Sequence, residues 1–178
     1  SILYGLSFNK PSVILTLHSV TTEFEESFSQ ISEVLDALKL FDIEILGIYS
    51  NADAGGKKII ELLKQQDGMI LIPNIKSNHF ASLMKHCTVM VGNSSAGIRE
   101  APTFGLPVIN IGSRQNGRER SINVLDCEFK KDDIVECMKK VLFDKEFSKK
   151  LNNVKNIYGD GKSAERIVSL IKMKVQKG

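Results

Sequence analysis

The stretch VMVGNSSAGIREAPTFGLPVINIG, residues 89–112, decides how this chain is expected to fold. It begins with a short apolar strand, turns at Gly92, opens a helix at Ser94 and Ser95, and then leads into a second apolar strand. A strand that turns directly into a helix leaves free backbone N–H groups, and the helix dipole adds partial positive charge there. Capping the helix needs only one small polar residue, whereas this turn supplies two hydroxyls. The stretch therefore predicts a site for phosphate oxygens.

A carboxylate follows on the same helix, which we expect to continue as far as Phe104. Glu100 lies five residues after Ser95. A carboxylate repels phosphate, but it accepts hydrogen bonds from the paired hydroxyls of a ribose. The alternative is a surface glutamate that pairs with Arg99 or a lysine. Together, the serines and Glu100 predict a nucleotide that lies across the start of the helix.

Strand and helix patterns alternate along the chain. Short apolar runs, typical of buried strands, occupy residues 13–17, 43–49, 69–72, 88–91, 107–111 and 123–127. Helical patterns occupy residues 25–40, 78–86, 132–143, 146–154 and 163–175, with a further helix around residues 59–63. Residues 1–12 have no clear period and look like the tail of a preceding element or a connector. This alternation predicts an α/β fold, a parallel sheet with helices on both faces, in a single domain spanning residues 1–178.

Each unusual polar loop follows the end of an expected strand. These loops contain His18, Asn51, Asn74, Ser94 and Arg114. Ligands of parallel α/β sheets bind outside the carboxyl ends of the strands. We therefore expect the five loops to converge on one crevice.

Several of these residues have an ordinary structural alternative. His18 could be a histidine of the core, or it could contact phosphate and transfer protons. Asn51 could cap its loop or contact the ligand. Arg114 could neutralise a leaving phosphate, but Arg118 and Arg120 are close in sequence, and spacing does not decide which arginine faces the crevice.

Composition narrows the class of protein. The formal net charge is +3, from 24 basic and 21 acidic residues, and neither end carries a charged tail, so nothing favours nucleic acid or a membrane surface as the partner. The three cysteines are scattered and lack C-x-x-C spacing. We therefore expect neither a disulfide framework nor a metal site. A reducing cytoplasm is the expected location. No apolar run approaches the length of a membrane span.

Four motifs together resemble one family, the hydrolysing UDP-N-acetylglucosamine 2-epimerases. The motifs are GNSSAGIREAPTFGLPVINIGSRQNGR at residues 92–118, HSVTTE at 18–23, NADAG at 51–55 and YGDGKSAERI at 158–167. The family includes bacterial enzymes of the sialic-acid and legionaminic-acid pathways and the epimerase half of the animal bifunctional epimerase/kinase. The resemblance covers residues 13–171. It departs at Ser19, where the family commonly has proline, and this change should alter loop stiffness without removing a functional group.

The resemblance implies a GT-B fold, which has two Rossmann-like halves with the nucleotide between them, and this chain is similar to the carboxyl-terminal half. By analogy, Ser94 and Ser95 would hold the diphosphate, Glu100 the ribose and Arg114 a phosphate. The remaining implied contacts are Asn51 and His18 with the diphosphate and sugar, and the backbone of Ile75 with the uracil.

The implied reaction is loss of UDP to give a glycal, followed by addition of water to release N-acetylmannosamine. The proton-transferring carboxylates belong to the absent amino-terminal half, and His18 is the one acid–base group expected here, so the isolated chain should be inactive. The implied partners are a UDP-sugar and the amino-terminal domain, with a homo-oligomer in the full-length enzyme and no cofactor. The UDP-sugar could be UDP-N-acetylglucosamine or a diacetamido-trideoxy relative.

Two other functions remain open at this point, a GT-B glycosyltransferase domain and a UDP-sugar-binding module without catalysis. We also expect the final helix, with Ile167, Leu170 and Ile171 on one face, to leave an exposed apolar surface. The opening segment, with Tyr4, Leu6 and Phe8, is expected to be exposed as well.

Overall fold

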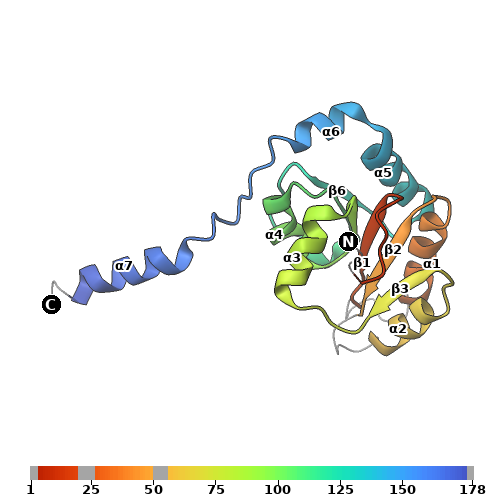
Figure 1. Cartoon of the computed structure of the whole chain (residues 1–178), viewed down its shortest axis with the longest axis horizontal. Coiled ribbons are helices and arrows are strands. Elements are labelled where there is room, and N and C mark those ends of the chain that lie inside the picture. Colours follow the sequence, from red (N-terminus) through yellow and green to blue (C-terminus); the bar gives the residue numbers. More distant parts are fainter. Residues whose placement is uncertain (1–3, 20–26, 50–55, 176–178) are drawn as a thin grey trace.

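The chain folds around a sheet of six parallel strands in the order β3-β2-β1-β4-β5-β6 (Figure 1). The computed structural model describes residues 4–19, 27–49 and 56–175. The strands are β1 (Ser12–Thr16), β2 (Glu44–Ile48), β3 (Met69–Ile72), β4 (Val89–Gly92), β5 (Val108–Ile111) and β6 (Val124–Cys127). All six strands predicted from the apolar runs are confirmed, each to within one residue at either end.

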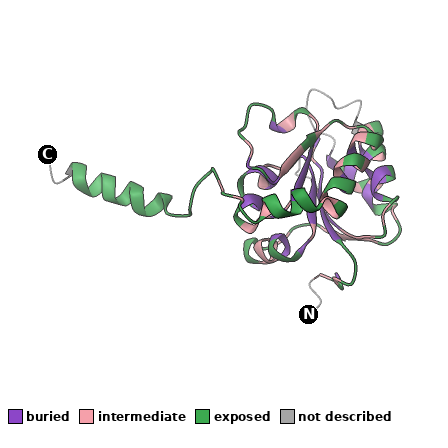
Figure 2. Ribbon diagram, turned by 90° about the horizontal axis from the view of Figure 1, so that it is seen from above, coloured by how far each residue is buried: buried purple, intermediate pink, exposed green. Residues whose placement is uncertain are grey.

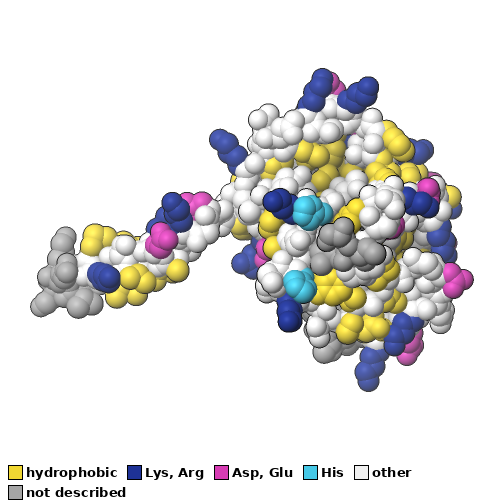
Figure 3. Space-filling model, in the orientation of Figure 1, with side chains coloured by type: hydrophobic (Ala, Val, Ile, Leu, Met, Phe, Trp, Pro, Cys, Tyr) yellow, Lys and Arg dark blue, Asp and Glu magenta, His cyan; other side chains and the backbone are white. Residues whose placement is uncertain are grey.

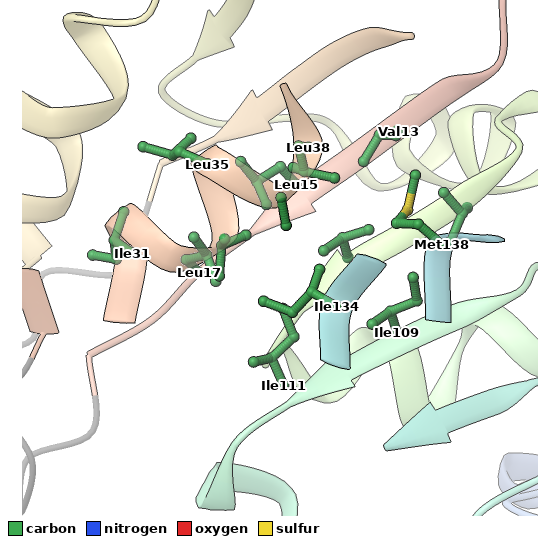
Figure 4. Packing of buried hydrophobic residues seen from close by; sticks show 14 of the residues in the cluster. Val13, Leu15, Leu17, Ile31, Leu35, Leu38, Ile109, Ile111, Ile134 and Met138 are labelled. Carbon is green, nitrogen blue, oxygen red and sulfur yellow. The ribbon is translucent and has the colours of Figure 1, made fainter. Parts of the chain in front are cut away.

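Helices cover both faces of the sheet, as predicted. The helices α1 (Ser27–Leu38), α2 (Gly56–Lys64) and α5 (Lys131–Phe143) cover one face, and α3 (Ser77–His86) covers the other together with α4 (Ser95–Arg99) (Figure 1). The side chains of β1 alternate between the two cores, because successive residues of a strand point to opposite faces. Val13 and Leu15 pack with α1 and α5 (Figure 4), whereas Ile14 packs on the α3 side.

The helix that begins after β4 is shorter than predicted. We expected it to continue to Phe104, but α4 ends at Arg99, Glu100 is its C-cap, and a separate 3₁₀ turn follows at η2 (Ala101–Phe104). Pro102 lies at the start of that turn. Proline has no backbone N–H and its ring collides with the carbonyl four residues earlier, so the α-helix cannot continue through it. Glu100 therefore lies at a break between two short helical turns.

The opening segment is packed against the body, and the prediction that it is exposed is wrong. Leu6 is fully buried in the core on the α3 side. Tyr4 and Phe8 are half-buried, and the hydroxyl of Tyr4 lies 2.7 Å from Nδ1 of His79, while the ring of Phe8 meets that of His86 edge-on. The segment is irregular rather than a strand, so it has no sequence period that could reveal its burial.

The end of the chain leaves the body. The helix α6 (Lys145–Leu151) follows α5, and a linker then carries the chain to α7 (Ser163–Val175), which extends away from the sheet (Figure 1). Every side chain described on α7 is exposed (Figure 2), including Ile167, Leu170 and Ile171. These side chains form apolar surface along the helix (Figure 3), as predicted. Among the described residues, no helix combines the length and apolar character needed to cross a membrane.

Candidate nucleotide site

The order of the strands places a crevice between β1 and β4. Successive strands are added in one direction from β1 to β3 and in the other from β4 to β6, so the connections diverge between β1 and β4. In open parallel sheets, ligands bind outside the carboxyl ends of the strands at such a point. His18 follows β1 and Asn93 follows β4, so both residues lie at this position.

Asn93 joins the loops that follow β1 and β4. Its side chain is fully buried, its Oδ1 accepts from the backbone N–H of His18 at 2.8 Å, and its Nδ2 donates to the carbonyl of His18 at 2.8 Å. Two hydrogen bonds to one backbone residue fix both the position and the orientation of the loop. His18 is therefore held directly beside the turn that begins α4.

The turn before Asn93 requires a residue without a side chain. Gly92 has φ of +133°, and a Cβ atom there would lie 2.0 Å from the carbonyl oxygen of Thr16 on β1. Glycine adopts such a φ readily and lets two backbones approach closely. This close approach brings the ends of β1 and β4, and hence His18 and Asn93, together.

The loop after β5 contributes the arginine that faces this site. Arg114 Nη1 donates to the carbonyl of Asn93 at 3.2 Å, and Gln115 Nε2 donates to the same carbonyl at 2.8 Å. Arg120 instead pairs with Asp126 on β6, with Nε 3.0 Å from Oδ2, and Arg118 is exposed. Of the three arginines that the sequence left open, Arg114 is therefore the one beside the start of α4.

The two serines begin α4. Ser94 is the N-cap, and its Oγ accepts from the backbone N–H of Ala96 at 3.3 Å. Capping therefore accounts for one hydroxyl, as the structural alternative proposed. Ser95 is the first residue of the helix, and both serines are half-buried. Their backbone and the guanidinium of Arg114 supply the kinds of group that bind an anion.

A groove of about 920 Å³ lies at the other end of α4. Glu100 and Ile75 line it, together with Phe80 and Met84 of α3 and Tyr158 of the C-terminal linker. Glu100 is exposed and Ile75 is half-buried. The groove thus combines an apolar wall with a carboxylate, which suits a flat base attached to a sugar with hydroxyl groups.

The C-terminal linker forms one wall of this groove and is tied to α4 and η2. Asn156 Nδ2 donates to the carbonyl of Arg99 at 2.8 Å and to Oγ1 of Thr103 at 2.7 Å. Asp160 also lines the groove and pairs with both terminal nitrogens of Arg166, at 2.8 and 2.7 Å. The hydrogen bonds from Arg166, followed by one from the backbone N–H of Lys162, lower the pKa of Asp160 to about 2. Asp160 is therefore an ion-pair partner at the base of α7 rather than a proton donor near neutral pH.

The structure brings the predicted residues together in two adjoining groups. His18, Ser94, Ser95 and Arg114 lie around Asn93, and Ile75 and Glu100 line the groove. Asn51 lies outside the described residues. Within residues 4–19, 27–49 and 56–175, no group of three or more His, Cys, Asp or Glu side chains is arranged to hold a metal ion.

Two residues of the site, Asn93 and Gln115, were not predicted from the sequence. Both are buried polar side chains that bond to backbone atoms rather than to the expected ligand. Asparagine is common in turns, so Asn93 after Gly92 does not by itself indicate a role in the site. Its position directly after a buried strand was the available signal.

A family model described as UDP-N-acetylglucosamine 2-epimerase matches residues 3–172. A Legionella pneumophila protein named UDP-N,N'-diacetylbacillosamine 2-epimerase (hydrolyzing) is 34% identical over 172 residues, covering 95% of this chain and 44% of that protein. A Neisseria meningitidis UDP-N-acetylglucosamine 2-epimerase is 38% identical over 137 residues, covering 76% of this chain and 36% of its own length. This chain therefore spans less than half the length of these two relatives.

Solved structures agree with the fold. The structure of the N. meningitidis UDP-GlcNAc 2-epimerase bound to UDP-GlcNAc superposes with a TM-score of 0.78, at 20% identity over 94% of this chain and 46% of that one. A Staphylococcus aureus MnaA–UDP structure gives a TM-score of 0.76 at 19% identity, over 95% of this chain and 46% of that one. The predicted fold class is confirmed, since this chain corresponds to about half of such GT-B structures.

Proposed function

This chain belongs to the UDP-N-acetylglucosamine 2-epimerase family, and we propose that it is the UDP-binding, carboxyl-terminal half of a hydrolysing enzyme of that family. The full enzyme would convert a UDP-N-acetylated sugar and water into UDP and the free 2-epimeric sugar. The observation that carries the proposal is the arrangement along α4. Groups suited to a diphosphate lie at its start, and a carboxylate and apolar groove suited to a nucleoside lie at its end.

The length of α4 fits this assignment. Its five residues rise about 1.5 Å each, so roughly 7 Å separates the two ends, which is comparable to the distance from a diphosphate to the ribose hydroxyls. Ser94, Ser95 and Arg114 would bind the diphosphate, and Glu100 would bind the ribose hydroxyls. Ile75, on the same groove, would offer its backbone to the uracil.

The chemistry needs more acid–base groups than the described residues place beside the diphosphate. Loss of UDP to give a glycal removes a proton from a sugar carbon, and hydration of the glycal returns one. His18 lies at the diphosphate end of the site and could donate a hydrogen bond or a proton to the departing phosphate. One histidine does not reach both faces of a sugar ring, so we assign the other acid–base groups to the remaining half of the protein.

For the sugar, we propose only its chemical class. Similar proteins are named for UDP-N-acetylglucosamine and for UDP-N,N'-diacetylbacillosamine, and both sugars carry the 2-acetamido group next to the carbon that loses UDP. The groups that would distinguish them contact the far side of the sugar, which the other half of the protein would cover. We favour an epimerase over a glycosyltransferase or a module without catalysis because the matching family model is that of an epimerase.

The test is to supply the missing half. The chain and a separately produced amino-terminal half from the same protein are assayed for UDP release from UDP-N-acetylglucosamine, each alone and mixed. We expect release only in the mixture, and we expect Arg114→Ala to abolish most of it because that guanidinium stabilises the departing diphosphate. Robust release by this chain alone, or none from a mixture of two folded halves with either candidate sugar, would contradict the proposal.

A further inference from the structure

The break between α4 and η2 leaves one backbone carbonyl without a donor in either turn. In a continuous α-helix the N–H of Thr103 would donate to the carbonyl of Arg99, but here it donates to the carbonyl of Glu100 at 3.0 Å. A 3₁₀ turn would use the N–H three residues after Arg99, and Pro102 at that position has none. The carbonyl of Arg99, directly before Glu100, therefore takes its hydrogen bond from elsewhere in the chain.

Asn156 on the C-terminal linker supplies that hydrogen bond. Its Nδ2 donates to the carbonyl of Arg99 at 2.8 Å and to Oγ1 of Thr103 at 2.7 Å, and its Oδ1 accepts from the backbone N–H of Tyr158 at 2.9 Å. An asparagine amide has two N–H donors, so one nitrogen can serve both acceptors. One side chain therefore holds together the end of α4, the η2 turn and the linker.

The linker is also tied to the body on either side of Asn156. The carbonyl of Lys155 accepts from Oγ of Ser121 at 2.9 Å, and the hydroxyl of Tyr158 donates to the carbonyl of Glu119 at 3.0 Å. Both partners lie in the loop that precedes β6. Lys155, Asn156 and Tyr158 all line the groove that ends α4, so this part of the linker is a fixed wall of it.

The position of Glu100 depends on its backbone. Its side chain is exposed, and within the described part of the chain its carboxylate takes part in no hydrogen bond or ion pair. The peptide group that joins Arg99 to Glu100 is planar, and it is held at both ends. Its N–H donates to the carbonyl of Ala96 at 3.0 Å, and its carbonyl accepts from Asn156. Asn156 therefore fixes the orientation of the peptide group from which Glu100 extends.

We propose, on the basis of the function proposed above, that Asn156 is a positioning residue for the ribose. It acts through Glu100, because it holds the peptide group before that residue and so directs the carboxylate toward the hydroxyls of the sugar. The diphosphate lies at the other end of α4 and does not depend on it. Loss of Asn156 should therefore weaken a nucleoside diphosphate and leave a bare diphosphate unaffected.

A double-mutant cycle tests this role in the folded chain, with NMR titrations of UDP and of pyrophosphate. Asn156→Ala should weaken UDP about fivefold, the equivalent of one hydrogen bond, and change pyrophosphate little. In a Glu100→Ala background no carboxylate remains to be positioned, so the same substitution should change UDP affinity by less than about twofold. Asn153→Ala, at an exposed asparagine just after α6, is the matched control and should bind UDP as the unaltered chain does.

A second variant separates the lost hydrogen bonds from lost volume in the groove wall. Asn156→Leu keeps a side chain of similar shape but has no N–H, and it should weaken UDP as much as Asn156→Ala does. Unchanged UDP affinity in Asn156→Leu would overturn the positioning role, as would equal losses for UDP and pyrophosphate or the same loss with and without Glu100. Failure of the unaltered chain to bind UDP would contradict the proposed function, and the role of Asn156 with it.

Discussion

At the scale of single residues, Asn93 is the connection on which the site depends. It bonds to the backbone of His18 through both ends of its amide, and its own carbonyl accepts from Arg114 and Gln115. Three loops from three strands therefore meet at one buried residue, through its side chain and its carbonyl. We therefore expect the hydrogen bonds of Asn93 to support both the stability of the fold and the binding of a ligand.

Replacing Asn93 by alanine should lower the free energy of unfolding by about 2–4 kcal/mol, because it leaves a backbone donor and a backbone acceptor of His18 without their partners. Urea unfolding followed by circular dichroism measures the change. The matched variant is Asn152→Ala, at an exposed asparagine at the end of α6, which should stay within about 0.5 kcal/mol of the unaltered chain. Equal losses of unfolding free energy for the two variants would show that the side chain of Asn93 does not hold the loops together.

Glu100 should distinguish a nucleoside from a bare diphosphate. Glu100→Ala should weaken the binding of UDP about tenfold, since a hydrogen bond to a charged group is worth roughly 1.5 kcal/mol or more. Binding of pyrophosphate should change little, because the diphosphate lies at the other end of α4. Ligand-detected NMR measures both affinities, and Glu61→Ala, on the opposite face of the sheet, is the control. A similar loss for both ligands would overturn the assignment of Glu100 to the ribose.

At the scale of elements, the pairing of β1 with β4 depends on Gly92. Gly92→Ala should prevent folding or cost several kcal/mol, because the new Cβ would lie 2.0 Å from the carbonyl oxygen of Thr16. Gly117 also has a positive φ, +77°, but an added Cβ there meets nothing within 4 Å. Gly117→Ala should therefore cost only about 1 kcal/mol of backbone strain. Equal losses of stability for Gly92→Ala and Gly117→Ala in thermal unfolding would show that the close approach of β1 and β4 does not require a glycine at position 92.

The elements differ in how far the sequence predicts them. The strands were predicted to within one residue because most are short, continuous apolar runs, and such a run is visible in the sequence without knowledge of distant parts of the chain. The end of α4 was missed although Pro102 was visible, since Ile98, Ala101 and Phe104 recur at helical spacing and suggested one continuous helix. The burial of Leu6 was missed because the segment around it touches α3 and the sheet without forming a regular element.

The candidate site was predicted in its residue types but not in its connections. His18, Ser94 and Arg114 stood out because they follow the ends of apolar strands, where ligands of parallel sheets bind. Glu100 stood out because of its spacing from Ser95. Arg120 pairs with Asp126 on β6 and therefore does not face the site, whereas Arg114 does. No local sequence pattern reveals such a pair.

At the scale of the whole molecule, α7 is the part that the rest of this chain does not cover. Ile167, Leu170 and Ile171 are 56–60% exposed on a helix that leaves the body. Because similar proteins are about twice as long as this chain, we propose that the amino-terminal half covers this face in the full protein. Alone, the face should promote association between copies of the chain.

Sedimentation velocity over a range of concentrations measures that association. The unaltered chain should associate as its concentration rises, and the double variant Ile167→Lys and Ile171→Lys should remain monomeric, because two charges on the apolar face oppose its burial. A matched control, Lys172→Ala, should associate as the unaltered chain does. Monomer at every concentration for the unaltered chain would show that this face does not drive association.

The central claim is that this chain binds UDP along α4, and an amide-resolved NMR titration of the folded chain with UDP tests it most directly. We predict weak binding, near the millimolar end of the scale or about −4 kcal/mol, because the proposed function assigns half of the pocket to another part of the protein. Shift changes should concentrate at Ile75, at residues 94–100 and at Arg114, and leave the amides of α5 unaffected. Absence of shifts at high UDP concentration in a folded sample, or shifts that concentrate beside α5, would contradict the account.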